Sequence, residues 1–176
     1  MINKLHFKIK NSTIPKIVYS IILTVSIVWV LLIFLAPFLY NIDGPAAQFG
    51  SYIYMFFSET CHQIDSRSFT LWGYKLAVCS RCTVIYLSFL FSVILYPFIW
   101  KIKNEKLPNI LFLLIPAFLV FADAIFDLTG ILKNTFLTRT ITGFLIGFVL
   151  PMFLIPGFIN LFKSFYKIFY KWLHFG

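Results

Sequence analysis

The chain has 176 residues, of which 60% are hydrophobic and only 12% are charged, and its formal net charge is +9. Because a soluble domain carries about a quarter charged residues, this composition excludes a water-soluble globular protein and indicates that lipid surrounds most of the chain. The position of the positive charges argues against a nucleic-acid partner, because the lysines lie beside apolar stretches.

Four apolar stretches are each about 20 residues long or slightly longer, which is enough to cross a hydrocarbon core of about 30 Å. They cover residues 17–40, 78–100, 107–128 and 135–158. We therefore predict an all-α membrane protein with four transmembrane helices, formed as a single membrane domain over residues 1–176. The first stretch is longer than the apolar region of a secretory signal, so we expect it to be retained as an anchor.

The lysines predict the orientation of these helices. Ten of the fifteen Lys and Arg residues lie in three short segments that flank apolar stretches; they are Lys4, Lys8, Lys10, Lys16, Lys101, Lys103, Lys106, Lys163, Lys167 and Lys171. Of the six acidic residues only Glu105 lies with them, so these segments account for the whole net charge. Since cytoplasmic loops carry an excess of Lys and Arg, both termini are predicted to lie in the cytoplasm.

Two segments outside the predicted spans have amphipathic patterns. In the outer segment, residues 41–77, aromatic and apolar residues between Phe49 and Phe57 recur at helical spacing, which predicts a short amphipathic helix that packs at the membrane surface. The C-terminal tail, residues 159–176, has a lysine at every fourth position among aromatic residues. This pattern favours an amphipathic helix along the inner leaflet, although a simple end of the fourth helix fits almost as well.

The three cysteines lie in or beside this outer segment. Cys79 and Cys82 form a C-x-x-C at the start of the second span, and Cys61 is followed directly by His62. A C-x-x-C at a helix start points two sulfurs at one place, and thiolates with imidazole in a set of four suit tetrahedral zinc. We predict a zinc site of Cys61, Cys79, Cys82 and either His62 or a carboxylate. Because adjacent residues do not always reach one ion together, a supporting or catalytic role for His62 stays open.

Redox chemistry is the main alternative for these cysteines. A C-x-x-C at a helix N-terminus favours the thiolate, and bacterial quinone-linked disulfide-forming enzymes are small four-helix membrane proteins with such a pair outside. Those enzymes need a second pair to relay electrons, and here Cys61 is the only further thiol. A third alternative is one structural disulfide with a spare thiol. The cysteine pattern favours the metal site over both.

Charged residues also occur inside the predicted spans. Asp123 and Asp127 lie four residues apart on one face of the third span, and Arg139 lies one turn into the fourth at a similar depth. A charge in a membrane helix costs several kcal/mol unless it is paired, so it usually marks a functional site. We predict that Asp123, Asp127 and Arg139 form catalytic groups. The alternative is an Asp–Arg pair that only holds two helices together.

An anionic substrate is predicted from further residues at the same end of the spans. Arg67 and Arg81, with Arg139, suit a phosphate or carboxylate, and Tyr86 lies one turn below Cys82 on the same helix face. The expected partners are membrane lipids and a lipid-like or small anionic substrate. A lipid-headgroup binder or carrier without chemistry is the third functional hypothesis.

Gly143 and Gly147 form a small-xxx-small pair that lets a neighbouring helix approach closely.

Several short motifs together resemble a known family. They are Cys61-His62-Gln63, Arg67-Ser68, Cys79-Ser80-Arg81-Cys82-Thr83 with Ile85-Tyr86, Asp123, and Arg139 with Thr142-Gly143. This pattern, from about Cys61 to Gly147, resembles the uncharacterised small prokaryotic membrane proteins catalogued as domain of unknown function 2085. The chain departs from the pattern at Val84, where the family usually has glycine. The resemblance implies a multi-pass protein of a bacterial or archaeal cytoplasmic membrane, and it implies no reaction.

Overall fold

The computed structural model describes the backbone of residues 2–102 and 106–175 and the side chains of residues 13–102 and 106–169. The predicted all-α fold is confirmed, since the described residues form five α-helices, one turn of 3₁₀ helix (Asp65–Arg67) and one short hairpin. The helices are α1 (Ile2–Tyr40), α2 (Pro45–Ser58), α3 (Ser80–Ile99), α4 (Leu111–Leu128) and α5 (Phe136–Phe175). Within the described residues, all of them except α2 are long and apolar enough to cross a membrane.

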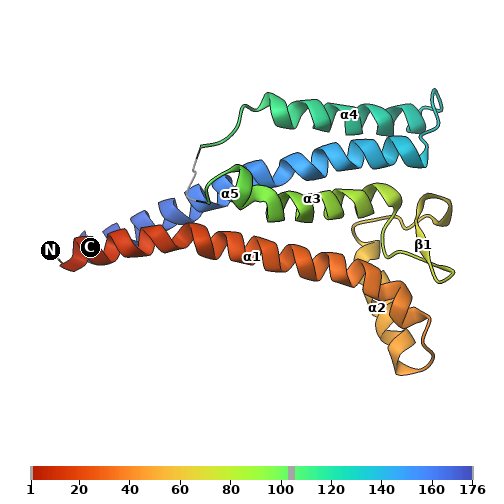
Figure 1. Ribbon diagram of the computed structural model, residues 1–176, viewed down its shortest axis with the longest axis horizontal. Helices are drawn as coiled ribbons and strands as arrows, with labels where there is room; N and C mark the ends of the chain where they lie inside the picture. The colour runs from red at the N-terminus through yellow and green to blue at the C-terminus, as the bar shows by residue number, and fades with distance from the viewer. Residues whose placement is uncertain (1, 103–105, 176) are drawn as a thin grey trace.

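The four long helices run side by side along the long axis of the molecule (Figure 1). The start of α1 and the end of α5 lie at one end, and α2 and the hairpin lie at the other. We call the latter the cysteine end, because Cys79 and Cys82 are at the start of α3. Among the predicted cytoplasmic charges, Lys103 and Glu105 lie outside the described residues, as do the side chains of Lys4, Lys8, Lys10 and Lys171.

Close packing of α5 on α3 depends on two glycines, as the small-xxx-small pair predicted. A Cβ atom at Gly147 would lie 2.2 Å from Ser88 Oγ and 2.3 Å from the carbonyl oxygen of Ile85. At Gly143 it would lie 2.9 Å from the carbonyl oxygen of Arg81. Any larger residue would push the helices apart, so these glycines let α5 pack directly against α3 from Arg81 to Ser88.

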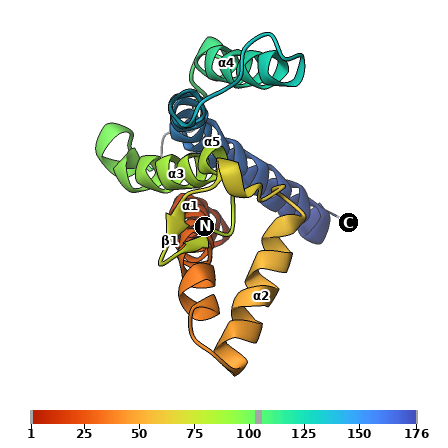
Figure 2. The same ribbon diagram turned by 90° about the vertical axis from the view of Figure 1, so that its right-hand side faces the viewer.

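Helix α2 is the predicted amphipathic helix at the cysteine end. Its Ile53 and Phe57 are buried and belong to one core cluster with Ile33 of α1. Figure 2 shows α2 extending away from α4 and α5, beside the end of α1. Phe49 and Tyr52 on its other face are 56% and 63% exposed, as expected for a helix whose second face meets lipid.

A short hairpin that the sequence patterns did not predict leads from α2 to α3. Strands β1 (Thr70–Leu71) and β2 (Tyr74–Lys75) pair antiparallel, and Trp72 and Gly73 form the turn with φ values of 50° and 82°. Positive φ values at both central residues are typical of the two-residue turn whose twist matches that of the paired strands. The chain then passes through the buried segment 76–78 and enters α3 at Cys79, its N-cap.

Helices α1 and α5 are both longer than the predicted spans. At about 1.5 Å per residue, a 40-residue helix such as α5 is roughly 60 Å long, about twice the thickness of a hydrocarbon core. The tail, residues 159–176, is therefore not a separate helix: its described part continues α5 to Phe175. The structure agrees with the second of the two alternatives for this tail, because no break in the helix separates the apolar stretch from the lysines.

Candidate metal centre and the adjoining arginine cleft

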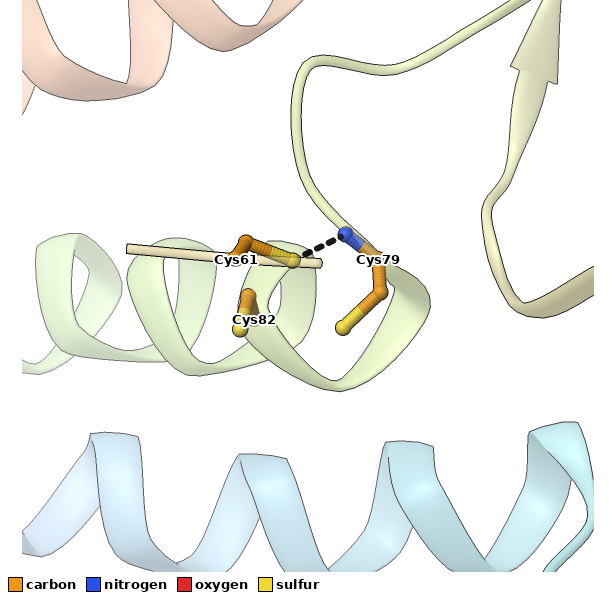
Figure 3. A group of neighbouring side chains, drawn as sticks. All are labelled: Cys61, Cys79 and Cys82. Atoms are coloured by element: carbon orange, nitrogen blue, oxygen red, sulfur yellow. Dashed lines mark hydrogen bonds between the residues drawn. The ribbon is translucent and has the colours of Figure 1, made fainter. Parts of the chain in front are cut away.

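The three cysteines converge, as their spacing predicted. The sulfur atoms of Cys61, Cys79 and Cys82 all lie within 4.8 Å of one another. Figure 3 shows Cys79 and Cys82 at the start of α3, and Cys61 reaching them from the separate segment that follows α2. Zinc–sulfur bonds of about 2.3 Å in a tetrahedron set sulfurs about 3.8 Å apart, so small side-chain movements would close this group around one ion.

Backbone hydrogen bonds hold Cys61 in place. Its N–H donates to the carbonyl oxygen of Phe57 at 2.9 Å, which continues the last turn of α2. Its sulfur accepts a hydrogen bond from the backbone N–H of Cys79 at 3.2 Å. Hydrogen bonds from the thiols of Cys79 and Cys82 lower the pKa of Cys61, and they outweigh the burial that opposes ionisation. This arrangement favours the thiolate, which is the form that binds metals.

Gln63 links the two segments that carry the cysteines. Its side-chain amide donates to the carbonyl oxygens of Tyr54 at 2.7 Å and Ala77 at 2.8 Å, so it connects α2 to the segment that enters α3. Its backbone adopts a φ of 49°, which is uncommon for a residue other than glycine. Lys75 donates to the carbonyl oxygen of Gln63 at 2.8 Å. Sequence reasoning gave Gln63 no role, although its place beside Cys61-His62 was a signal.

His62 is not part of the group of three sulfurs. Its side chain is exposed, and the described residues supply no fourth Cys, His, Asp or Glu ligand atom within 4.8 Å of all three thiols. His62 instead lines a cleft beside them. Its role as a fourth ligand therefore stays a prediction that would require a rotation of the side chain.

This cleft has a volume of about 370 Å³ and is bounded by the cysteine segment, α3, α4 and α5. We call it the arginine cleft, because its walls include Arg67, Arg81 and Arg139 together with Asp127. All three cysteines line it as well. The structure thus brings the predicted metal ligands, the predicted anion-binding arginines and one predicted catalytic carboxylate to a single site.

Asp127 is the centre of the charge network in the cleft. Its Oδ2 lies 3.2 Å from Nη1 of Arg67 and 3.8 Å from Nη2 of Arg139, and its Oδ1 accepts a hydrogen bond from the backbone N–H of Asn134 at 3.1 Å. Arg139 also donates from Nε to Oδ1 of Asn134 at 2.6 Å. With only 8% of its side chain exposed, Arg139 is held by partners on two sides.

Asp123 does not pair with Arg139, the arginine considered for it from the sequence. It forms an ion pair with Arg81 of α3, and it accepts a hydrogen bond from Nδ2 of Asn134 at 3.4 Å. Asp123 itself does not line the cleft. The pairs that join the helices are therefore Asp123 with Arg81 and Asp127 with Arg139: α4 packs beside α5, and the side chain of Arg81 reaches from the start of α3 to Asp123.

Tyr86 does not reach the arginine cleft. Its ring packs against Trp29 of α1 with a centroid distance of 5.6 Å. It lines a separate, mainly apolar cleft of about 250 Å³ between α1, α3 and α5, where Phe89 and Leu150 also lie. Tyr86 follows Cys82 by one turn of α3, and its side chain points toward α1 rather than α4. Asn134 takes the polar role in the arginine cleft, and as part of a short turn it gave no sequence signal.

Comparison with known proteins agrees with this architecture. A family model described as a predicted membrane protein, DUF2085, matches residues 61–154, a range that contains the three cysteines and the whole arginine cleft except Thr60. No solved structure matches the chain. An uncharacterised protein of Methanocaldococcus jannaschii is 37% identical over 147 residues, 81% of this chain and 94% of the relative. One of Methanothermobacter thermautotrophicus is 36% identical over 91 residues, 51% of this chain and 78% of the relative. The chain therefore belongs to the DUF2085 family of predicted membrane proteins.

Proposed function

We propose that this membrane protein binds one zinc ion through Cys61, Cys79 and Cys82, and that the ion faces a membrane-associated substrate in the arginine cleft. The observation that supports this most directly is the approach of three sulfurs within 4.8 Å in the wall of a charged cleft. Zinc suits the site because thiolates are among its preferred ligands, and binding of the ion would itself deprotonate the thiols.

The number of ligands favours a reactive metal over a purely structural one. Structural zinc sites are closed by four protein ligands, whereas catalytic sites use three and leave the fourth position to water or substrate. Among the described residues, three sulfurs converge without a fourth ligand beside them. A zinc ion there would polarise an oxygen of the substrate, while Asp127 and Arg139 line the same cleft and would supply a carboxylate and a guanidinium to it.

Zinc content tests this proposal. Protein purified in detergent, without added chelator, is expected to contain about one zinc ion per chain, as a single three-thiolate site implies. Inductively coupled plasma mass spectrometry on a sample of known protein concentration measures this ratio. A metal-free protein in which all three thiols react freely, or in which two are joined by a disulfide, would disprove the proposed metal site.

A thiol oxidoreductase is the second candidate, because the same three sulfurs are close enough to exchange disulfides. In such a reaction two thiols would lose two electrons and two protons to form a disulfide, and a membrane quinone would take both to become a quinol. A disulfide that forms with quinone and reverses with dithiothreitol in metal-free protein would favour this candidate over zinc.

We also propose that the cysteine end lies outside the cytoplasmic membrane, with both termini in the cytoplasm, because the lysine-bearing segments flank the opposite ends of the spans. A membrane-impermeant maleimide is expected to label the cysteines in intact cells after chelation and mild reduction. Labelling is read by a mass shift, with an abundant cytosolic thiol protein as the control for intact membranes. Labelling that appears only after lysis would show that the cysteine end faces the cytoplasm.

A further inference from the structure

We propose that the arginine cleft is a binding site for a phosphate oxyanion, and that it presents this anion to the three-thiolate site. The anion site itself stands on the arginines, whereas its relation to the metal rests on the proposed function. The cleft lies where α4 ends at Leu128 and α5 begins at Phe136, which is the end of the spans. Phosphate groups of membrane lipids and dissolved phosphate both reach this depth.

The charges in and behind the cleft do not balance. Among the described residues, Arg67, Arg81 and Arg139 line it, and only Asp123 and Asp127 form ion pairs with them. The arginines therefore exceed the carboxylates by one positive charge, before any charge on the thiols is counted. A zinc ion on three thiolates would carry one formal negative charge, so this third arginine would cancel it, and an incoming anion would not meet a net negative site.

Arg67 is the arginine best placed to bind an incoming anion. Its side chain is 43% exposed, compared with 18% for Arg81 and 8% for Arg139, and it forms one ion pair, with Asp127. A guanidinium offers five donors in a planar fork that matches two oxygens of a phosphate. Arg67 can therefore turn donors toward a ligand while the two buried arginines keep the wall in place.

Two further donor groups lie at the wall formed by α3. Nε of Arg81 is buried and has no hydrogen-bond partner among the described residues. Cys79 caps the start of α3 without a side-chain hydrogen bond, so the first turn keeps unpaired backbone N–H groups and the positive end of the helix dipole. Cys79, Arg81 and Cys82 all line the cleft, so the N-terminus of α3 adjoins both the proposed anion and the proposed metal.

Phosphate binding to the full-length chain in detergent is the direct test. Equilibrium dialysis with radiolabelled inorganic phosphate should show saturable binding, which dihexanoyl phosphatidic acid displaces. Arg67→Gln is expected to weaken binding at least tenfold, and Arg67→Lys less, because it keeps the charge and loses the fork. Lys133→Gln is the matched control: it removes one exposed positive charge near the same end without touching the cleft, and should change affinity less than twofold.

The outcomes separate the two sources of phosphate and the two proposals. Displacement by the lipid at a tenfold lower concentration than by unlabelled phosphate identifies a headgroup site, and equal concentrations identify a site for free phosphate. No saturable binding, or equal weakening by Arg67→Gln and Lys133→Gln, overturns the anion site even if the protein contains zinc. Phosphate binding that depends on Arg67 in a zinc-free chain supports the anion site and overturns only its link to the metal.

Discussion

Cys79→Ser and Cys82→Ser are each expected to reduce the zinc content from about one ion per chain to about a tenth of that or less. Structural zinc sites with four protein ligands bind the ion with about 10–16 kcal/mol at neutral pH, and a proposed site with only three protein ligands would lose a third of them in each variant. Both sulfurs belong to the converging group. Mass spectrometry of the metal against protein concentration measures the loss, and circular dichroism verifies that each variant keeps its helices.

Ser80→Ala is the matched control for these two variants. Ser80 lies between them at the start of α3, and its buried hydroxyl has no hydrogen-bond partner among the described residues, so its removal should leave the zinc content unchanged. His62→Ala is also expected to retain the metal, because the exposed His62 is not part of the three-sulfur group. Loss of zinc in His62→Ala would instead identify His62 as a fourth ligand, and the site would then have no open position for a substrate.

The helices and the meeting of the cysteines could be predicted because both depend on local patterns. Long apolar runs specify spans, since no other backbone state satisfies its hydrogen bonds in lipid. The C-x-x-C pair lies within one turn of α3, and Cys61 is joined to it by a segment that begins and ends at the same end of the bundle. Spacing and topology alone therefore placed three sulfurs together.

The remaining features of the site depend on lateral neighbours, which one sequence does not reveal. Depth along the helices predicted that Asp123, Arg81 and Arg139 lie at a similar level, but the ion pair with Arg81 depends on how α4 is rotated against α3 and α5. Tyr86 shares a helix face with Cys82, yet it points to Trp29 on α1. The hairpin was missed because its strands have only two residues each, too few to show alternation.

The ion pair between Asp123 and Arg81 is expected to act as a helix clamp, with a large penalty for losing one partner. Asp123→Leu leaves the guanidinium of Arg81, whose side chain is only 18% exposed, without its carboxylate. Breaking such a buried pair costs about 3–5 kcal/mol, whereas replacing both members with apolar residues is often neutral, because neither charge must then be desolvated. The double variant Asp123→Leu with Arg81→Met should therefore recover most of the lost stability.

Unfolding of the detergent-solubilised protein by increasing dodecyl sulfate measures these differences, and Asp123→Asn separates the clamp from a role in the metal site. The amide keeps the shape of the carboxylate and one acceptor for Arg81, so the loss of stability should be smaller than in Asp123→Leu. Because Asp123 lies behind the cleft, Asp123→Asn should also retain zinc. A stable Asp123→Asn protein without zinc would place this carboxylate in the metal shell, and a double variant as unstable as Asp123→Leu would show that the pair is more than a clamp.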